Sequence, residues 1–149
     1  MAKIIVGVDG SEASRAAVRW AAGEAALRGV PLVAVEAWEF SPLIFAADVP
    51  VALDELRASV TEHLHGVVAD EVGDVVDVTE LVVEKAPVPA LLDEASAEDL
   101  LVVGSRGRRG LSGLLLGSVS QQVAQHATCP VVIVRPPEGT NSTSAQEGS

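Results

Sequence analysis

The sequence predicts an α/β fold: an open, mostly parallel five-stranded sheet with helices on both faces. Short apolar runs rich in valine and isoleucine alternate along the chain with longer segments of helical periodicity. Near-continuous apolar runs are typical of parallel strands that are covered on both faces. Because parallel neighbours need right-handed crossover connections, the intervening helices are expected on both faces of the sheet.

The first three elements are a strand, a helix and a second strand. Residues 3–8 (KIIVGV) form the first apolar run. Residues 11–28 are rich in alanine and predict a helix, with Ser11 as a suitable N-cap and Gly29 as a suitable end. The run Leu32–Trp38 predicts the second strand, and only Glu36 interrupts its apolar character.

A loop, a long helix, a third strand and a short helix follow. Prolines delimit a loop at residues 40–50, and Gly73 marks the expected end of the helix after it. Residues 75–83 predict a strand, and residues 87–97 predict a helix that begins on a proline. One apolar face is predicted for the long helix by Leu53, Leu56, Val60, Leu64 and Val68.

The last elements surround a glycine-rich segment. Residues 100–103 predict a fourth strand, Ser118–His126 a helix and Val131–Val134 a fifth strand. No internal repeat is visible, so residues 1–136 are expected to form a single domain. The polar residues 137–149 are expected to form a disordered tail.

Composition argues against several classes of function. The chain of 149 residues has a net charge of -11, two Trp, two Phe and no Tyr. Nucleic-acid binders normally carry a broad basic face and aromatic side chains for stacking, so no nucleic-acid partner is expected. No run of about 18 apolar residues is available to span a bilayer, and no secretory leader is visible. We therefore expect a cytoplasmic protein without membrane contact.

The sequence does not indicate which residues, if any, would bind a metal ion. His63 and His65 are two residues apart, so on a helix their side chains diverge and cannot share an ion. Cys129 is the single cysteine, which excludes an internal disulfide, and we expect it to be a small buried side chain.

Residues 104–118, GSRGRRGLSGLLLGS, carry five glycines and three of the ten basic residues. Glycines allow a backbone to approach a ligand closely and to direct successive N–H groups into one concavity, which suits phosphate oxygens. The segment leads into a helix, whose first N–H groups attract anions. Ser118 is the predicted N-cap of that helix, and Gln121 would complete a capping box.

Arg106, Arg108 and Arg109 lie among these glycines. Exposed charges act over about 8 Å at physiological salt, so a phosphate here would feel these guanidinium groups more than distant acidic residues. Each charge-assisted hydrogen bond contributes roughly 1.5–3 kcal/mol. Phosphate binding is favoured on this basis. The alternative is a flexible loop with solvated arginines, packed down by its leucines.

The spacing of the glycines distinguishes between the known phosphate-binding motifs. The P-loop pattern GxxxxGK[ST] is absent, and so is GxGxxG after the first strand, where the sequence is GVDGSE. Instead, Gly104-x2-Gly107-x9-Gly117-Ser118 matches the G-x2-G-x9-G-[S/T] motif of ATP-binding universal stress proteins. The chain resembles this family over nearly all of residues 3–135, including KIIVGVDGS at the start and CPVVIVRP at the end. The resemblance implies a Rossmann-like fold of the adenine nucleotide alpha hydrolase type.

The resemblance also implies roles for individual residues. Gly104 and Gly107 would bring the backbone close to the ribose and phosphates, and the segment from Gly117 would bind the phosphates. Gly7 and Asp9 would lie near the adenosine, and Asp9 would either accept hydrogen bonds from the nucleotide or orient water around a bound Mg²⁺. Ala37 would contact adenine. The complete predicted ATP site comprises Gly7, Asp9, Ala37, Gly104, Ser105, Arg106, Gly107, Arg108, Arg109, Gly110, Gly117, Ser118, Val119 and Ser120.

The function implied by the resemblance is that of an ATP-binding regulatory protein of the stress response. No residue is evident that would aim a water molecule at the γ-phosphate, so ATP hydrolysis is expected to be slow at most. Two alternatives stay open: an enzyme of the same fold, either an ATP hydrolase or an adenylyl-transferring enzyme, and a nucleotide-free interaction module.

The fifth strand, Val131–Val134, resembles the edge through which the family dimerises. An uncovered apolar edge strand is prone to aggregation. A homodimer that pairs through this strand is therefore expected.

Overall fold

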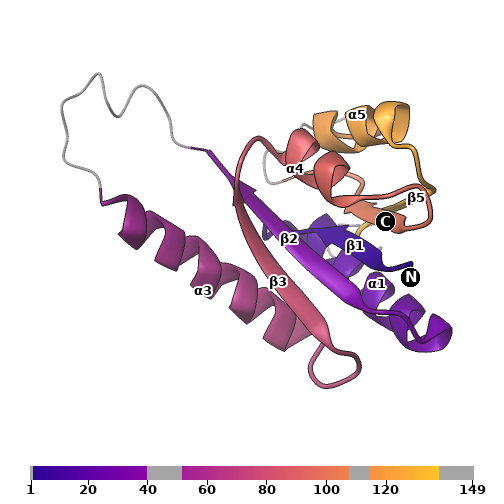
Figure 1. The fold of residues 1–149 in the computed structure, drawn as a ribbon, viewed down its shortest axis with the longest axis horizontal. Coiled ribbons are helices and arrows are strands. Elements are labelled where there is room, and N and C mark those ends of the chain that lie inside the picture. Colours follow the sequence, from indigo (N-terminus) through magenta and orange to yellow (C-terminus); the bar gives the residue numbers. More distant parts are fainter. Residues whose placement is uncertain (1, 40–51, 108–114, 138–149) are drawn as a thin grey trace, which may run out of the picture.

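The computed structural model describes residues 2–39, 52–107 and 115–137, which form a five-stranded sheet with helices packed against it (Figure 1). Every pair of neighbouring strands is parallel, so the predicted fold class is confirmed. The loop predicted at residues 40–50 and almost all of the predicted tail lie outside the described residues. In chain order the elements are β1 (Ile4–Gly7), α1 (Glu12–Arg28), β2 (Leu32–Trp38), α3 (Leu53–Glu71), β3 (Val78–Glu84), α4 (Pro87–Glu94), β4 (Leu100–Gly104), α5 (Ser118–His126) and β5 (Val131–Val134).

The order of the strands in the sheet is β3-β2-β1-β4-β5. From β1 the chain adds β2 and then β3 on one side of the sheet. It then returns to the other side of β1, where it adds β4 and β5. The direction of winding therefore reverses between β1 and β4, where Ile4 is in register with Leu100. In open parallel sheets the strand ends at such a reversal leave a crevice beyond their carboxyl ends, and this is where ligands bind.

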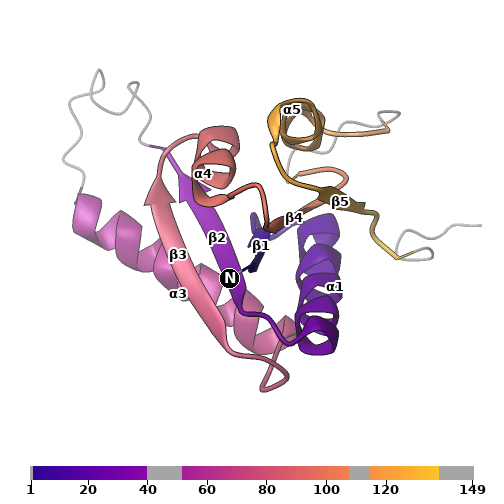
Figure 2. The same cartoon turned by 45° about the vertical axis from the view of Figure 1, so that its right-hand side comes forward.

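Two apolar cores lie on the two faces of the sheet. Successive strand residues point to opposite faces, so Ile4 packs in the core under α1 and α3, whereas Ile5 packs in the core under α4 and α5. Figure 2 shows α4 and α5 together on one side and α1 and α3 on the other. The helices on both faces were predicted, and the structure confirms them.

Helix α1 begins and ends as predicted. The Ser11 hydroxyl accepts a hydrogen bond from the Ser14 N–H at 3.1 Å, and Gly29 ends the helix with φ 66°. The face of α1 toward the sheet is mostly alanine, which lets the helix lie close to the strands.

The first turn of α1 also touches the end of β4. A Cβ at Gly104 would lie 2.7 Å from the Ala13 carbonyl carbon and 2.8 Å from the Ser14 nitrogen, both of them backbone atoms. Only glycine fits this contact without a backbone shift.

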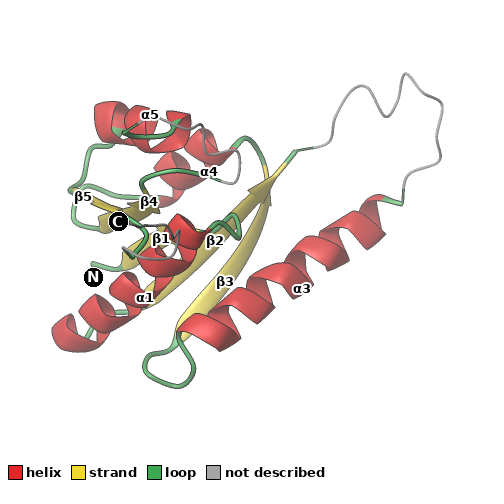
Figure 3. Cartoon of the chain, turned by 180° about the vertical axis from the view of Figure 1, so that it is seen from behind, coloured by secondary structure: helices red, strands yellow, loops and turns green. Residues whose placement is uncertain are grey.

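Helix α3 departs from its predicted burial. Leu64 and Val68 are buried, as predicted, but Leu53 and Leu56 are 44% and 37% exposed. Figure 3 shows the reason: the first turns of α3 project away from the strands. The apolar periodicity is real, but the described part of the sheet does not extend far enough to cover its first half.

Two predicted boundaries differ from the structure by three residues. The third strand begins at Val78 rather than at residue 75, and Val75 is 63% exposed. The helix predicted at residues 87–97 ends at Glu94. Cys129 is buried, as predicted, and this burial raises the pKa of its thiol. Within the described residues, no helix combines the length and apolar character needed to cross a membrane.

At the amino ends of the strands, Asp99 joins β1 to β4. Its carboxylate accepts hydrogen bonds from the Lys3 N–H at 3.0 Å, the Lys3 ammonium at 2.9 Å and the Ser96 N–H at 2.8 Å. Burial by itself would raise the pKa of Asp99, but these bonds outweigh burial and hold the pKa below its usual value.

Gly104→Ala is expected to lower the free energy of unfolding by about 1–3 kcal/mol, because the added methyl group meets backbone that cannot turn aside. Gly66→Ala is the matched control, since no atom lies within 4 Å of the Cβ position in that helix. The free energy of unfolding of the control should rise by up to about 1 kcal/mol, because alanine has a higher helix propensity than glycine. Urea denaturation of both variants measures the difference. Equal stability of Gly104→Ala and the parent would contradict the close contact.

The Asp99 carboxylate is expected to make stability depend on acid pH. Because its pKa is lower in the folded than in the unfolded chain, its contribution is complete above about pH 4 and is lost as the pH falls through the folded value. Asp99→Asn should therefore be less stable than the parent at neutral pH, and the gap should narrow in acid. Urea titrations at a series of pH values measure the gap; a gap independent of pH would exclude this role.

Candidate functional site

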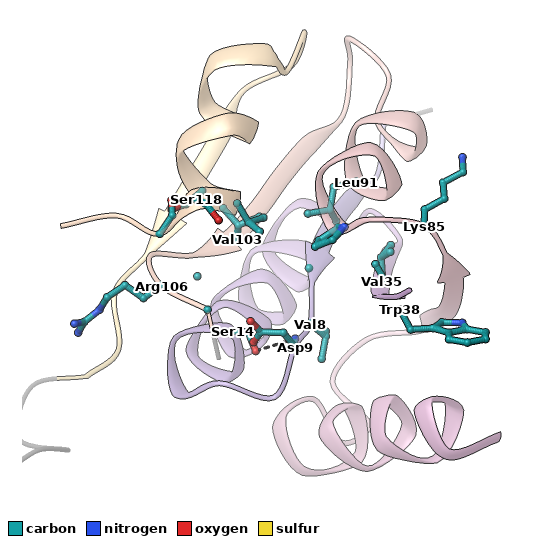
Figure 4. A pocket seen from close by; sticks show the side chains of 18 of the residues that line it. Val8, Asp9, Ser14, Val35, Trp38, Lys85, Leu91, Val103, Arg106 and Ser118 are labelled. Carbon is teal, nitrogen blue, oxygen red and sulfur yellow. Dashed lines mark hydrogen bonds between the residues drawn. The ribbon is translucent and has the colours of Figure 1, made fainter. Parts of the chain in front are cut away.

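A pocket of about 680 Å³ lies in the crevice at the β1–β4 reversal, bounded on its far side by the start of α5 (Figure 4). Residues from five separate segments meet around it: the ends of β1, β2, β3 and β4 with the residues that follow them, and the start of α5. The predicted site residues that line the pocket are Gly7, Asp9, Ala37, Gly104, Arg106, Gly107, Gly117, Ser118, Val119 and Ser120.

The start of α5 presents hydrogen-bond donors to the pocket. Gly117, rather than Ser118, is the N-cap residue, and the first N–H bonded within the helix is that of Gln121, which donates to the Gly117 carbonyl at 3.1 Å. Amides that precede it in the first turn have no acceptor within the helix, and they carry the positive end of the helix dipole. The N–H groups of Ser118, Val119 and Ser120 and the Ser118 hydroxyl therefore make this end of the pocket suitable for an anion.

The predicted capping box is wrong. The Gln121 side chain donates to the Leu116 carbonyl at 3.1 Å and does not reach back to the N-cap. A glycine at the cap position has no side chain to occupy the first amides. This leaves the amides at the mouth of the helix available to a ligand.

Ser105 does not line the pocket, although it was predicted as a ligand contact. Its N–H donates to the Val134 carbonyl at 2.8 Å, and its carbonyl accepts from the Gly117 N–H at 2.7 Å and from the Ser120 hydroxyl at 3.0 Å. Its side chain is buried. Ser105 thus ties β4 to β5 and to the start of α5, and it holds the anion-binding end in place.

Asp9 connects the two loops at the β1–β4 reversal. One carboxylate oxygen accepts the Ser11 N–H at 2.9 Å, and the Asp9 N–H donates to the Ser14 hydroxyl at 3.3 Å. The other oxygen lies 2.9 Å from the position that a Cβ would take at Gly107, so a larger residue there would displace the loop or the carboxylate. The Ser11 hydroxyl reaches the Arg106 carbonyl at 3.4 Å.

The opposite end of the pocket has mostly apolar walls, with Trp38, Glu39 and Lys85 beside them. Val35 and Ala37 come from β2, Val103 from β4, and Leu91 from α4. A Cβ at Gly7 would lie 3.1 Å from a methyl group of Leu91, so the glycine widens this end. A slot with apolar walls next to a group of polar donors is typical of small-molecule sites and suits a flat ring.

Few cations of the described residues point into the pocket. Arg106 lines it, but its guanidinium group points away from Asp9 and Ser118 (Figure 4). The Lys85 ammonium pairs with Asp93 at 2.7 Å and also points away from them. Arg108, Arg109 and Gly110 lie outside the described residues. The anion-binding character of the described pocket therefore depends on amides and hydroxyls.

Sequence reasoning missed the residues that only the fold brings to this edge. The pocket residues at the ends of strands could have been inferred, because they neighbour predicted site residues in the sequence. The pocket residues of α4 belong to no sequence motif that would mark them as part of a site. No group of three or more metal-ligating side chains occurs within the described ranges. The missed pocket residues are Val8, Ser14, Val35, Trp38, Glu39, Lys85, Pro87, Leu91 and Val103.

The relatives of this chain among known proteins include universal stress proteins of mycobacteria. A universal stress protein of Mycolicibacterium smegmatis (strain ATCC 700084 / mc(2)155) is 42% identical over 140 residues. The universal stress protein Rv2005c of Mycobacterium tuberculosis (strain ATCC 25618 / H37Rv) is 39% identical over 136 residues. The alignments cover 89% and 90% of this chain but only 45% of each relative, so the chain spans less than half the length of these relatives.

Solved structures with the same fold include nucleotide complexes. A universal stress protein in complex with cAMP has a TM-score of 0.68 and 31% identity, over 91% of this chain and 98% of that one. The universal stress protein of Archaeoglobus fulgidus in complex with dAMP has a TM-score of 0.62 and 27% identity, over 90% and 98% of the two chains.

The model of the universal stress protein family matches residues 1–135, which include every strand and helix described above. The sheet order, the glycine spacing and the pocket at the reversal all lie within this match. The chain belongs to the universal stress protein family.

Proposed function

We propose that this chain acts as a cytoplasmic, ATP-binding regulatory protein of the stress response, and that its residues 1–136 form one nucleotide-binding domain. The observation that carries the proposal is the polarity of the pocket. At one end lie the amides and hydroxyl of the first turn of α5, and at the other end lie apolar side chains from β2, β4 and α4. Complexes of two family members with cAMP and dAMP support an adenine nucleotide as the ligand.

The nucleotide fits the pocket in one direction. Adenine would lie in the apolar slot beside Ala37, and the phosphates would accept hydrogen bonds from the N–H groups of Ser118 and Val119. The ribose would then pass Gly7 and Asp9, between the two ends. Negative charge next to the first turn of a helix is stabilised by the free amides and the helix dipole.

A magnesium ion fits the donor set at the phosphate end. Mg²⁺ usually binds through one or two carboxylates together with phosphate oxygens and water. Asp9 is a carboxylate that lines the pocket, and its second oxygen faces the Gly107 loop. Bound Mg²⁺ would neutralise phosphate charge in a chain whose net charge is -11.

Slow hydrolysis follows from the same residues. Phosphoryl transfer needs an aimed water molecule and cationic groups that stabilise the developing charge. One oxygen of Asp9 is committed to the Ser11 N–H, and the Arg106 guanidinium points away from Ser118. The described residues therefore favour binding of a nucleotide over its hydrolysis. The regulatory effect would be that the protein binds different partners in different nucleotide states.

We also propose a homodimer that pairs through β5. This strand forms one edge of the sheet, and its four residues, all valine or isoleucine, are only half-buried. Pairing with a second copy would cover an apolar edge that otherwise invites aggregation.

Calorimetric titration with ATP, ADP, AMP and GTP, each with Mg²⁺, tests the ligand. We expect adenine nucleotides to bind at micromolar concentration and GTP to bind about tenfold more weakly, because the apolar side chains from β2, β4 and α4 offer the extra polar groups of guanine no hydrogen bond. Incubation with labelled ATP should give turnover well below about 1 s⁻¹. Rapid turnover would favour the enzyme alternative, and the absence of heat with every nucleotide would favour a nucleotide-free interaction module.

Gly117→Ala and Ser118→Ala are each expected to weaken ATP binding about tenfold, which corresponds to about 1.4 kcal/mol. The first narrows the space before α5, and the second removes a hydroxyl donor. Both should fold, since Gly117 has φ -76° and its Cβ would make contacts no shorter than 3.4 Å. Thr61→Ala, which removes a hydroxyl from α3, is the control and should bind as the parent does. Parental affinity in both site variants would refute the phosphate assignment.

A further inference from the structure

A buried carboxylate interrupts the apolar strand β2. The Glu36 side chain is only 6% exposed, and both of its oxygens lie close to Nδ1 of His63 on α3, at 2.7 and 2.9 Å. Burial of a carboxylate is costly unless hydrogen bonds compensate, and the His63 imidazole supplies one of the donors to this side chain. Apolar residues often replace such a buried pair without loss of stability, so packing alone does not explain why the pair lies here.

The other edge of the His63 ring covers Gly10, the residue between Asp9 and Ser11. A Cβ at Gly10 would lie 2.8 Å from Nε2 and 2.9 Å from Cε1 of His63. Gly10 also has φ 84°, in the left-handed region that favours glycine. The imidazole therefore occupies the space that a side chain at Gly10 would need, and it limits how far the turn can move toward α3.

The turn that His63 covers forms part of the pocket wall. Asp9 lines the pocket, its carboxylate accepts the Ser11 N–H, and the Ser11 hydroxyl contacts the Arg106 carbonyl. A displacement of Gly10 toward α3 would lengthen these contacts and move Asp9 away from the Gly107 loop. The chain of contacts runs from Glu36 through His63 to the loop at the end of β1.

We propose that His63 is a positioning residue for nucleotide binding: Glu36 orients its imidazole, and the imidazole holds the turn of residues 9–11 in the shape that receives the nucleotide. This inference rests on the proposed function for the identity of the ligand. Helix α3 does not line the pocket, yet under this inference it influences the affinity for the nucleotide through His63.

The experiment compares two substitutions that separate the two edges of the ring. His63→Asn keeps an amide donor where Nδ1 lies, so Glu36 retains a partner, but it removes the group above Gly10. His63→Gln places an amide where Nε2 lies, above Gly10, but it lacks the donor beside Glu36. His65→Asn is the matched control, because His65 lies on the same helix and pairs with Glu80 at 3.1 Å on the exposed surface.

We expect His63→Asn to unfold near the parent's midpoint but to bind ATP about tenfold more weakly, since a small displacement of a binding element costs affinity. His63→Gln should recover part of that loss, and His65→Asn should bind as the parent does. In the absence of nucleotide, the Ser11 amide should exchange about tenfold faster in His63→Asn than in the parent.

The two measurements, ATP affinity and exchange of the Ser11 amide, distinguish failure of this inference from failure of the proposed function. Parental ATP affinity together with parental Ser11 exchange in His63→Asn would overturn the positioning role. If the parent bound no ATP but Ser11 exchange still rose only in His63→Asn, the proposed ligand would be wrong, whereas the hold of His63 on the turn would stand.

Discussion

The close contact between Gly104 and the first turn of α1 is the constraint on which the site depends. With the end of β4 against backbone atoms of Ala13 and Ser14, the segment that follows β4 has to leave beside Asp9. Gly107 then meets the Asp9 carboxylate, and the Ser11 hydroxyl meets the Arg106 carbonyl. The pocket is thus a consequence of how tightly one strand and one helix approach each other at the reversal of the sheet.

The buried polar side chains of the described residues gather at the same edge. Ser14, Glu36, Ser105 and Ser120 lie near the carboxyl ends of the strands or the loops beyond them, whereas Asp99 lies at the opposite edge. Hydrogen bonds between loops have a definite geometry, which nondirectional apolar packing does not supply. Ser14 and Ser120 bond loop backbone at this edge, Ser105 ties β4 to β5 and α5, and Glu36 bonds β2 to α3. The strands below remain almost wholly apolar.

In the part of the chain that the structure describes, an anion in this pocket would meet amides and hydroxyls and no cluster of cations. The net charge is -11, the described lysine and arginine at the pocket point away from Asp9 and Ser118, and the donors that remain are mainly amides. Backbone amides at a helix start act only at short range and need a fitted ligand. Such a site would recognise the proposed nucleotide by shape and would not attract every polyanion.

The amino-acid sequence by itself determined the elements and the motif. The alternation of strands and helices, the bounds of β2, α5 and β5, and the glycine spacing from Gly104 to Ser118 are local patterns, and local patterns can be recognised without a fold. Tertiary structure decided the exposure of Leu56, the direction of Arg106 and the meeting of Glu36 with His63 and Gly10. These features depend on where one element ends relative to another, and no periodicity within a single segment contains that information.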